Sequence, residues 1–423
     1  MSIILKNATF IHWKTLEFTQ TSIKVESGLN GGITFLPVDL SGIDISKDEV
    51  IDCTGKLVTK AFAVGHHHVY STLARGMPVP PKQPENFLQI LEYVWWNLDK
   101  ALDKEMIEAS ALSTAMACAK AGSAFVIDHH ASPNAIRGSL EIIANAFDRV
   151  GVSHLLCYEI SDRDGHEKAQ LGLQETEEYL NANQGLVGLH ASFTVGDESL
   201  KKAVDLMKKT NSGIHIHVAE DLADQNHCQH HNDRQVVERL HHFGVLNSPK
   251  TILAHCLHLN ENERSLIRNS PAWIVENAES NLNNNVGHFR GTNLGKNIML
   301  GTDGMHSDML RSAQAAFFAG QEADQINVPE AYRRFRNVHH YLADNHFEGD
   351  GENNLVVLDY DSPTPITEHN FLGHFVFGLS SNHIRHVISN GSWLVKNKRL
   401  TNVNEKELLT FAKEQALRLW KKL

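Results

Sequence analysis

The sequence predicts an α/β protein built on a TIM-like (β/α)8 barrel, with a small β-sandwich domain assembled from both termini. Between residues 61 and 300, short apolar runs alternate with stretches of helical periodicity, which is the pattern of consecutive βα units and a parallel sheet. Eight such units in about 290 residues fit a (β/α)8 barrel. On either side, short strand-like runs are separated by Gly, Asn and Ser.

Eight short apolar runs are the predicted barrel strands, because each is bounded by turn residues or by a helical stretch. In chain order they cover residues 61–65, 124–128, 153–158, 186–189, 213–218, 251–254, 272–275 and 297–300. Helical spacing of apolar residues lies between them at 107–121, 140–150, 200–209 and 235–243, and after them at 309–321 and 330–343. We therefore assign residues 59–349 to the barrel.

Strand-like runs at both ends of the chain predict a second, smaller unit. They lie at residues 3–5, 22–25 and 33–36, and again at 354–358, 384–389 and 391–395. We expect residues 1–58 and 350–402 to form one composite β domain with the geometry of a small sandwich. The last segment, 403–423, has the spacing of an amphipathic helix.

The composition is that of a globular protein, with 42% hydrophobic and 21% charged residues. A net charge of −11 argues against a nucleic-acid or anionic-membrane partner, because both require a basic patch. No apolar stretch approaches the roughly 20 residues of a membrane helix, and the start of the chain lacks the pattern of a secretory signal. The five cysteines are scattered and odd in number, which favours free thiols and a cytoplasmic location.

Three consecutive histidines follow the first predicted barrel strand. Side chains of a strand alternate between its two faces, so His66 and His68 project together and His67 projects to the opposite side, toward the helices. Two imidazoles on one face at the end of a buried strand make half of a metal site. A histidine-rich turn is the alternative interpretation, because short motifs also arise by chance.

Ionisable residues also stand at the ends of other strands, where TIM-barrel enzymes carry their active residues. His217 lies near the end of strand five, His255 ends strand six and Asp303 ends strand eight. Each alone could be a hydrogen-bonded core residue, but an unpaired buried His or Asp is costly. Their recurrence at the same edge therefore favours one shared site. Glu220 reaches that site only if the chain bends after Val218.

The order His66-x-His68, His217-x-x-Glu220, His255, Asp303 resembles the amidohydrolase superfamily. In particular, it is similar to the single-metal aminohydrolases of the cytosine-deaminase, guanine-deaminase and triazine-hydrolase group. Segments 70–77, 254–256, 279–281 and 301–304 agree with this group, and segments 128–133, 157–165 and 188–194 resemble the SsnA-type aminohydrolases. The likeness runs nearly from end to end, and it implies the split β domain and a homo-oligomeric assembly.

The resemblance also implies the chemistry of the site. One divalent ion, zinc or ferrous iron, would be bound by His66, His68, His217 and Asp303, a ligand set that suits both metals. Asp303 would take a proton from the metal-activated water. His255 would orient that water and stabilise the oxyanion, and Glu220 would protonate a ring nitrogen of the substrate.

Two departures from the family pattern bear on these expectations. Members usually carry a Pro-Gly pair shortly before the first histidine, where this chain has Thr59-Lys60-Ala61-Phe62, and a small residue or Thr at the position of His67. The multi-metal relatives carry a carboxylated lysine at the end of strand four. This chain has Leu189-His190 and no lysine there, so we expect a mononuclear site.

Substrate contacts are expected from the loops that follow the strands. The candidates are Glu159, Arg163, His190, Asn281 and Arg75. Trp95 and Trp96 could stack on a flat ring, although packing between helices is the favoured interpretation for both. Of His129 and His130, at the end of strand two, one should face the barrel interior, and neither is expected to be a metal ligand.

Three functions compete at this stage. The leading one is hydrolytic deamination of a small nitrogen heterocycle. The second, opening a cyclic amide or displacing halide from a ring, uses the same site residues, so the motifs do not separate it from the first. The third is a non-catalytic barrel that binds metal, which the presence of Glu220, His255 and Asp303 disfavours. The sequence leaves the substrate and the choice between zinc and iron open.

Overall fold

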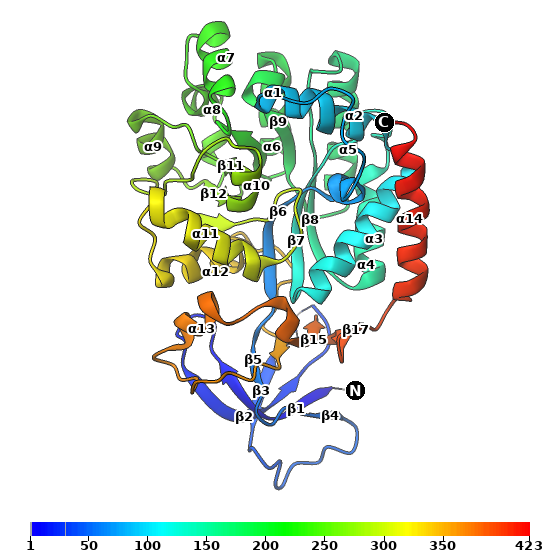
Figure 1. Cartoon of the computed structure of the whole chain (residues 1–423), viewed down its shortest axis with the longest axis vertical. Coiled ribbons are helices and arrows are strands. Elements are labelled where there is room, and N and C mark those ends of the chain that lie inside the picture. Colours follow the sequence, from blue (N-terminus) through cyan, green and yellow to red (C-terminus); the bar gives the residue numbers. More distant parts are fainter. Residues whose placement is uncertain (1, 30) are drawn as a thin grey trace.

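The computed structural model describes residues 2–29 and 31–423. Figure 1 shows a larger α/β part and, below it, a smaller part built around a sheet to which both ends of the chain contribute. The last helix runs along the side of the larger part, so the C-terminus lies far from the N-terminus. The α/β content and the parallel strands agree with the predicted fold class.

Eight parallel strands form two arcs, and each strand coincides with one of the eight predicted runs. The first arc has the order β6 (Phe62–His67), β7 (Ser123–His130) and β8 (Ser153–Tyr158). The second contains β9 (Val187–Ala191), β10 (Ile214–Val218), β11 (Ile252–His255), β12 (Trp273–Glu276) and β13 (Ile298–Leu300). Nearly every residue of these strands is buried, as expected for a parallel sheet that is covered on both faces.

The two arcs meet at a first seam between β8 and β9. Leu186 N donates a hydrogen bond to Leu156 O at 3.0 Å, and His190 N donates to Ile160 O at 3.0 Å. Parallel bridges pair Leu156 with Gly185 and Ile160 with Leu189. These bonds satisfy backbone groups that an open sheet edge would leave unpaired.

The arcs meet again at a second seam between β6 and the chain that follows β13. Thr302 N and Asp303 N donate hydrogen bonds to His66 O at 3.0 and 3.1 Å. A Cβ atom on Gly65 would lie 2.5 Å from Leu300 O. Glycine therefore allows the close backbone approach that brings the first and last strands of the barrel region together.

Helices alternate with the strands and cover the barrel region. Before β9 they are α1 (Phe87–Ile90), α2 (Trp96–Ala101), α3 (Lys104–Lys120), α4 (Ser139–Val150) and α5 (His166–Leu180). After β9 they are α6 (Asp197–Lys209), α7 (Leu222–Asn232), α8 (Val236–Phe243), α9 (Glu261–Arg268), α10 (Ala278–Asn283), α11 (Met309–Ala323) and α12 (Val328–Asp344). Figure 1 shows α1, α2 and α7 at the end of the barrel region away from the terminal sheet.

The C-terminal helix α14 (Glu405–Trp420) packs against α3 and has the predicted amphipathic character. Its Arg418 guanidinium contacts Asp103 at 2.9 Å. The indole nitrogen of Trp420 donates a hydrogen bond to Leu73 O at 2.8 Å. Leu73 belongs to the short helical segment Val69–Ala74 that follows β6, so α14 braces the chain directly after the three histidines.

Both ends of the chain build one nine-stranded sheet. Its strands are β1 (Ile3–Ile11), β2 (Phe18–Val25), β3 (Ile33–Leu36), β4 (Glu49–Asp52), β5 (Leu57–Lys60), β14 (Leu355–Leu358), β15 (Ile384–Ser389), β16 (Ser392–Lys396) and β17 (Arg399–Leu400). The antiparallel pair β5 and β14 joins the two halves, and helix α13 (Phe371–Phe377) lies between β14 and β15 in the chain. Ile23, Val58, Val357 and Ile388 belong to a core cluster of this sheet. The sequence did not predict β4, β5 or β17.

The segment that replaces the Pro-Gly pair is held by buried polar contacts. Lys60, at the end of β5, is 2% exposed. Its ammonium group donates to Asp350 O and Gly351 O, both at 2.9 Å. Arg336 of α12 donates to Lys60 O at 3.0 Å. These bonds anchor the chain where it passes from the terminal sheet into β6, a task that the backbone restriction of a proline would otherwise assist.

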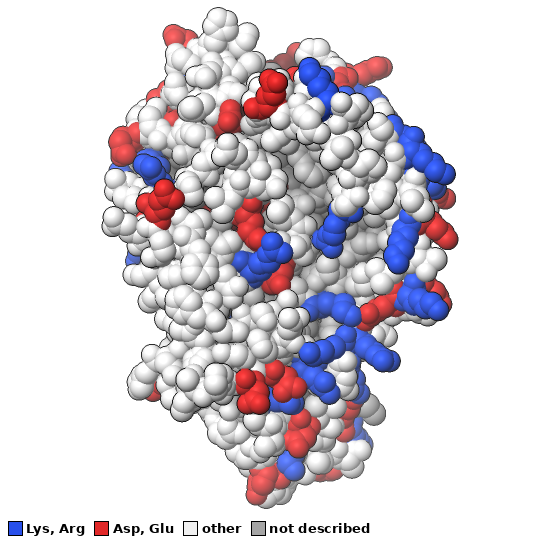
Figure 2. All heavy atoms as spheres, in the orientation of Figure 1, with Lys and Arg blue, Asp and Glu red and all other residues white. Residues whose placement is uncertain are grey.

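Charged side chains of both signs share the molecular surface. On the face in Figure 2, Lys and Arg gather where the barrel region meets the terminal sheet and along the edge formed by α14. Lys120, Arg311 and Lys398 line a surface hollow. All five cysteines are free and buried. Within the described ranges, no helix has the length and apolar character needed to cross a membrane.

Replacing Gly65 with Ala should destabilise the protein, because the added methyl group meets the backbone oxygen of Leu300 at 2.5 Å. We expect a loss of about 1–3 kcal/mol in the free energy of unfolding, the usual cost of overpacking. Thermal and urea unfolding would measure it. Gly373→Ala is the matched control, since nothing lies within 4 Å of its Cβ position. Equal stability of the two variants would contradict the close approach at this seam.

Candidate active site

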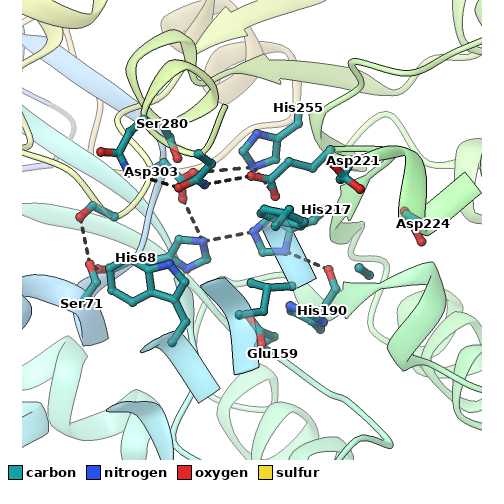
Figure 3. Close-up of a pocket in the computed structure, with 18 of the residues that line it drawn as sticks. His68, Ser71, Glu159, His190, His217, Asp221, Asp224, His255, Ser280 and Asp303 are labelled. Atoms are coloured by element: carbon teal, nitrogen blue, oxygen red, sulfur yellow. Dashed lines mark hydrogen bonds and ion pairs between the residues drawn. The ribbon is translucent and has the colours of Figure 1, made fainter. Parts of the chain in front are cut away.

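Side chains from four strand ends converge on one point (Figure 3). His66 Nε2 and His68 Nε2 lie 3.5 and 3.1 Å from Asp303 Oδ1. His68 Nε2 lies 3.1 Å from His217 Nε2, and His255 Nε2 lies 3.6 Å from Asp303 Oδ2. The structure thus brings together the residues that the sequence analysis placed in one site. One atom each of His66, His217, His255 and Asp303 lies within 4.8 Å of the others, a spacing that could hold a metal ion.

The imidazoles of the three predicted histidine ligands share one orientation. His68 Nδ1 lies 2.6 Å from His129 O, and His217 Nδ1 lies 2.8 Å from His190 O. Since a carbonyl oxygen only accepts, both Nδ1 atoms carry a proton, and each Nε2 faces the centre. His66 Nδ1 likewise points outward, to His215 Nε2 at 2.8 Å. Metal-bound histidines use their second nitrogen in the same way.

Burial sets the protonation of the centre. It lowers the pKa of His66 to about 3 and holds the pKa of His217 well below its ordinary value, so both imidazoles are neutral and able to bind a cation. His68 is different: burial opposes its protonation, but Asp303 raises its pKa to about 9. The Nε2 atoms of His66 and His255 are fully buried and have no hydrogen-bond partner within the described residues. A cation at the centre would compensate both atoms.

Backbone bends at or directly before Glu220, His255 and Asp303 turn these three side chains toward the centre. Ala219, His255 and Asp303 have positive φ angles of 46°, 70° and 50°, a conformation that costs side-chain-bearing residues energy and often marks functional sites. The bend at Ala219 directly follows β10 and turns Glu220 toward the pocket, as the sequence analysis required. Val218 still pairs with β11, so the strand ends where the turn begins.

Glu220 and His255 lie side by side at the edge of the centre. Glu220 Oε2 is 3.5 Å from His255 Nε2. His255 Nδ1 donates to Asn281 Oδ1 at 2.7 Å, and Asn284 donates to Glu220 Oε1 at 3.3 Å. Burial raises the pKa of Glu220 against the opposing effect of His255. Glu220 is therefore suited to carry a proton that a substrate can receive.

The centre opens into a pocket of about 740 Å³, part of which is open to solvent. Its wall includes Phe87, Leu91 and Trp95, which follow one another at four-residue intervals. The sequence analysis missed Phe87 and Leu91, although their helical spacing is visible in the sequence. Trp95 lines the pocket and also packs against the main hydrophobic core, as the favoured interpretation had it. Trp96 instead stacks on Arg163, whose guanidinium carbon lies 5.1 Å from its ring.

The predicted substrate contacts divide into two groups. Glu159 and His190 line the pocket. Arg163, Asn281 and Arg75 do not belong to its wall. Arg163 pairs with Asp99 and Asp164 instead, and Asn281 acts on the pocket through His255. The pattern of residues at strand ends identified the right loops but could not show which side chains are turned away.

Of the remaining histidines of the first two strands, His67 lies outside the converging set, whereas one ring nitrogen of His129 lies within 4.8 Å of ring nitrogens of His68 and His217. His67 Nε2 bonds to Ser307 Oγ at 2.8 Å, so His67 points away from the centre, as predicted, but toward the loop after β13 rather than toward the helices. His129 faces the barrel interior, where its Nε2 lies 3.1 Å from both Leu189 O and His215 O.

Sequence comparison places the chain in a family. A model described as "Amidohydrolase family" matches residues 61–349. The chain belongs to the amidohydrolase family.

Two curated relatives and one solved structure illustrate the similarity of this amidohydrolase to known proteins. The 5-methylthioadenosine/S-adenosylhomocysteine deaminase of Thermoanaerobacter pseudethanolicus is 24% identical over 99% of both chains. The 5'-deoxyadenosine deaminase of Methanopyrus kandleri is 27% identical over 84% of both chains. The crystal structure of an adenosine deaminase from Xanthomonas campestris with bound zinc superposes with a TM-score of 0.84 at 16% identity, over 99% of this chain and 98% of that one.

Replacing His217 with Ala should remove stoichiometric metal binding, because the central Nε2 of the converging set is lost. Metal analysis after dialysis against zinc should give about one ion per wild-type chain and far less in the variant. Circular dichroism would show whether the variant is folded. His227→Ala is the control, since His227 lies on α7 and is absent from the pocket wall. Unchanged metal content in His217→Ala would refute the ligand role.

Proposed function

We propose that this amidohydrolase is a metal-dependent aminohydrolase that deaminates a small nitrogen heterocycle by hydrolysis. The observation that carries the proposal is the convergence of His66, His68, His217, His255 and Asp303 beside Glu220, at the base of an apolar-walled pocket. The printed names of the curated relatives, which are deaminases of adenosine derivatives, support the same reaction class.

The proposed cofactor is one divalent ion, zinc or ferrous iron, held by His66, His68, His217 and Asp303. Three imidazoles and a carboxylate suit both metals. The uncompensated Nε2 of His66 and the outward Nδ1 bonds of His68 and His217 support this ligand set. The absence of a lysine at the end of β9, where His190 and Ala191 stand, supports a single ion.

A divalent ion bound there would lower the pKa of a water molecule and so supply the nucleophile near neutral pH. Asp303 Oδ2, 3.6 Å from His255 Nε2, is suited to take a proton from the attacking water. A proton on His255 Nε2, which lies between two carboxylates, would form a hydrogen bond that orients the attacking water and stabilises the oxyanion. Glu220 would protonate a ring nitrogen and then help to transfer a proton to the leaving amine, so that water and amine become a carbonyl and ammonia.

We also propose the finer architecture that the sequence suggests. The two arcs would close into one eight-stranded barrel, which the hydrogen bonds at both seams support. The terminal sheet would curl into a small sandwich, which its own core cluster supports. The corresponding domains are residues 1–58 with 350–402, residues 59–349, and the helix in 403–423. Membership of the SsnA-type group, a homo-oligomeric state and a cytoplasmic location stay predictions.

Ammonia release across a panel of purines, pyrimidines and triazines tests the reaction class. We expect release from at least one amino-substituted ring, dependent on the bound metal and abolished by a chelator. Halide release from chlorinated rings, or acid release from cyclic amides, would instead favour the alternative hydrolyses in the same site. A metal-loaded enzyme that turns over none of these compounds would favour the non-catalytic alternative.

Glu220→Gln and Asp303→Asn test the two proton-transfer roles. Each change keeps the size of the side chain and removes its ability to exchange a proton, so kcat should fall by about 100- to 10,000-fold. Metal content should be unchanged in Glu220→Gln, which lies outside the proposed ligand set. An active, metal-loaded Asp303→Asn variant would contradict the role of Asp303.

A further inference from the structure

His67, the middle one of the three consecutive histidines, takes no part in the proposed chemistry, although it is only 1% exposed. Its two ring nitrogens meet two other polar side chains. Nε2 lies 2.8 Å from Ser307 Oγ, and Nδ1 lies 3.7 Å from Asp128 Oδ1. Burying an imidazole is costly unless its polar atoms have partners, so these two contacts explain how this chain accommodates a histidine at the position.

The loop that His67 contacts carries Asp303. We call this segment, residues 303–308 between β13 and α11, the Asp303 loop. Asp303 and Ser307 have positive φ angles of 50° and 65°, a conformation that costs residues with side chains energy. Gly304 and Met305, which lie between them, line the pocket. A strained segment of this kind keeps one conformation only where the surrounding structure fixes it.

Strand β6 holds the Asp303 loop at its start and again near its end. At the start, Thr302 N and Asp303 N donate hydrogen bonds to His66 O at 3.0 and 3.1 Å. His67 also forms a parallel bridge with Asp303. Near the end, the His67 side chain contacts Ser307, which is 3% exposed. The two left-handed residues of the loop are therefore both attached to the same strand.

The direction of the hydrogen bond between His67 and Ser307 follows from Asp128, a buried residue of β7. Asp128 Oδ1 accepts a hydrogen bond from Val69 N at 2.7 Å, which fixes the carboxylate beside His67 Nδ1. A carboxylate at this place favours the tautomer that carries its proton on Nδ1. Nε2 then accepts, and the Ser307 hydroxyl donates to it. Three side chains thus connect β7, β6 and the Asp303 loop.

The order serine, histidine, aspartate is also that of a nucleophilic triad, but Ser307 is not placed as a nucleophile. A nucleophile must reach the substrate. Ser307 is buried and does not belong to the wall of the pocket that opens from the centre. His67 is also absent from that wall. The arrangement therefore favours a part in holding the loop over a part in breaking bonds.

We propose that His67 is a positioning residue, which fixes the Asp303 loop through Ser307 and thereby directs the Asp303 carboxylate toward the centre. The inference rests on the proposed function, in which Asp303 binds the ion and takes a proton. Asp303 Oδ1 lies 3.1 Å from His68 Nε2, and its Oδ2 lies 3.6 Å from His255 Nε2. A shift of about 1 Å in the loop would alter both spacings, and a shift of that size can lower a rate by about 100-fold.

Two replacements of His67 separate the hydrogen bond from the bulk of the ring. A Gln amide group extends about as far as Nε2, so His67→Gln can keep the contact with Ser307. The shorter His67→Asn cannot reach it, and Ser307→Ala removes the same contact from the other side. Groups that orient metal ligands typically contribute about 10- to 100-fold to metal affinity or activity. We expect losses in this range for His67→Asn and Ser307→Ala, and near wild-type behaviour for His67→Gln.

Loading the purified protein with cobalt(II) gives a readout that needs no substrate, because the visible absorption of this ion depends on its coordination geometry. His67→Asn and Ser307→Ala should change the absorption spectrum and weaken cobalt binding in a titration by about 10- to 100-fold. His67→Gln should match the wild type in both measurements. With a substrate from the ammonia-release panel, kcat should fall in the same two variants by a larger factor than KM rises.

Ser132→Ala is the matched control. His130 Nε2 lies 2.9 Å from Ser132 Oγ, and both residues are fully buried. The change therefore removes the same kind of contact at the end of the neighbouring strand β7, away from the Asp303 loop. Thermal unfolding should show comparable losses of stability in Ser132→Ala and Ser307→Ala, whereas the cobalt spectrum should change only in Ser307→Ala.

A folded Ser307→Ala variant with the cobalt spectrum and affinity of the wild type would overturn the inference. So would an equal spectral change in Ser132→Ala, or a His67→Gln variant that behaves like His67→Asn. Covalent labelling of Ser307 by a fluorophosphonate would identify a nucleophile and overturn it as well. If the spectra change as expected but the wild type releases ammonia from no ring, deamination fails and the positioning role stands. A wild-type chain that binds no cobalt would overturn both the ligand set and the inference.

Discussion

The structure depends on bringing buried polar atoms from distant strands to one point without leaving them uncompensated. Parallel strands have all their carboxyl ends on one rim, so residues far apart in the sequence meet there. Hydrogen bonds from the outward-facing Nδ1 atoms offset the cost of burying these imidazoles. Examples are His68 Nδ1 to His129 O and His217 Nδ1 to His190 O. On the inner side, the Nε2 atoms of His66 and His255 have no hydrogen-bond partner among the described residues, so a bound cation would compensate them.

The backbone contacts where the two arcs of strands meet also hold these buried polar side chains in position. His66 O accepts hydrogen bonds from the backbone of Thr302 and Asp303, so the segment that carries His66 and His68 holds Asp303 directly. The positive φ angle of Asp303 is a strain that this contact helps to maintain. The close approach at Gly65 acts at the same seam, and the buried anchor at Lys60 fixes the strand from its other end. The position of the centre is thus set by backbone contacts as well as by contacts between the converging side chains.

The sequence could predict the strands and the converging residues because both leave local signals. Buried parallel strands are short apolar runs, and their ends are marked by His or Asp where the apolar run stops. Strands β4 and β5 were missed because their pairing depends on partners far along the chain, and β17 was missed because it has only two residues. The sequence also could not predict the directions in which the side chains of loop residues point. Arg163 follows β8 closely, yet the pairing with Asp99 that turns it from the pocket depends on a helix more than sixty residues earlier.

The pocket extends beyond the converging centre, which bears on how one centre can serve different substrates. In the proposed function, the chemistry belongs to the side that contains Asp303, Glu220 and His255. Glu159 and His190 lie on the other side of His217 and also line the pocket (Figure 3). The wall around the rest of a ring is thus built by loops other than those that supply Glu220, His255 and Asp303. The motifs that indicate the reaction class therefore leave the substrate open, because different residues meet the rest of the substrate.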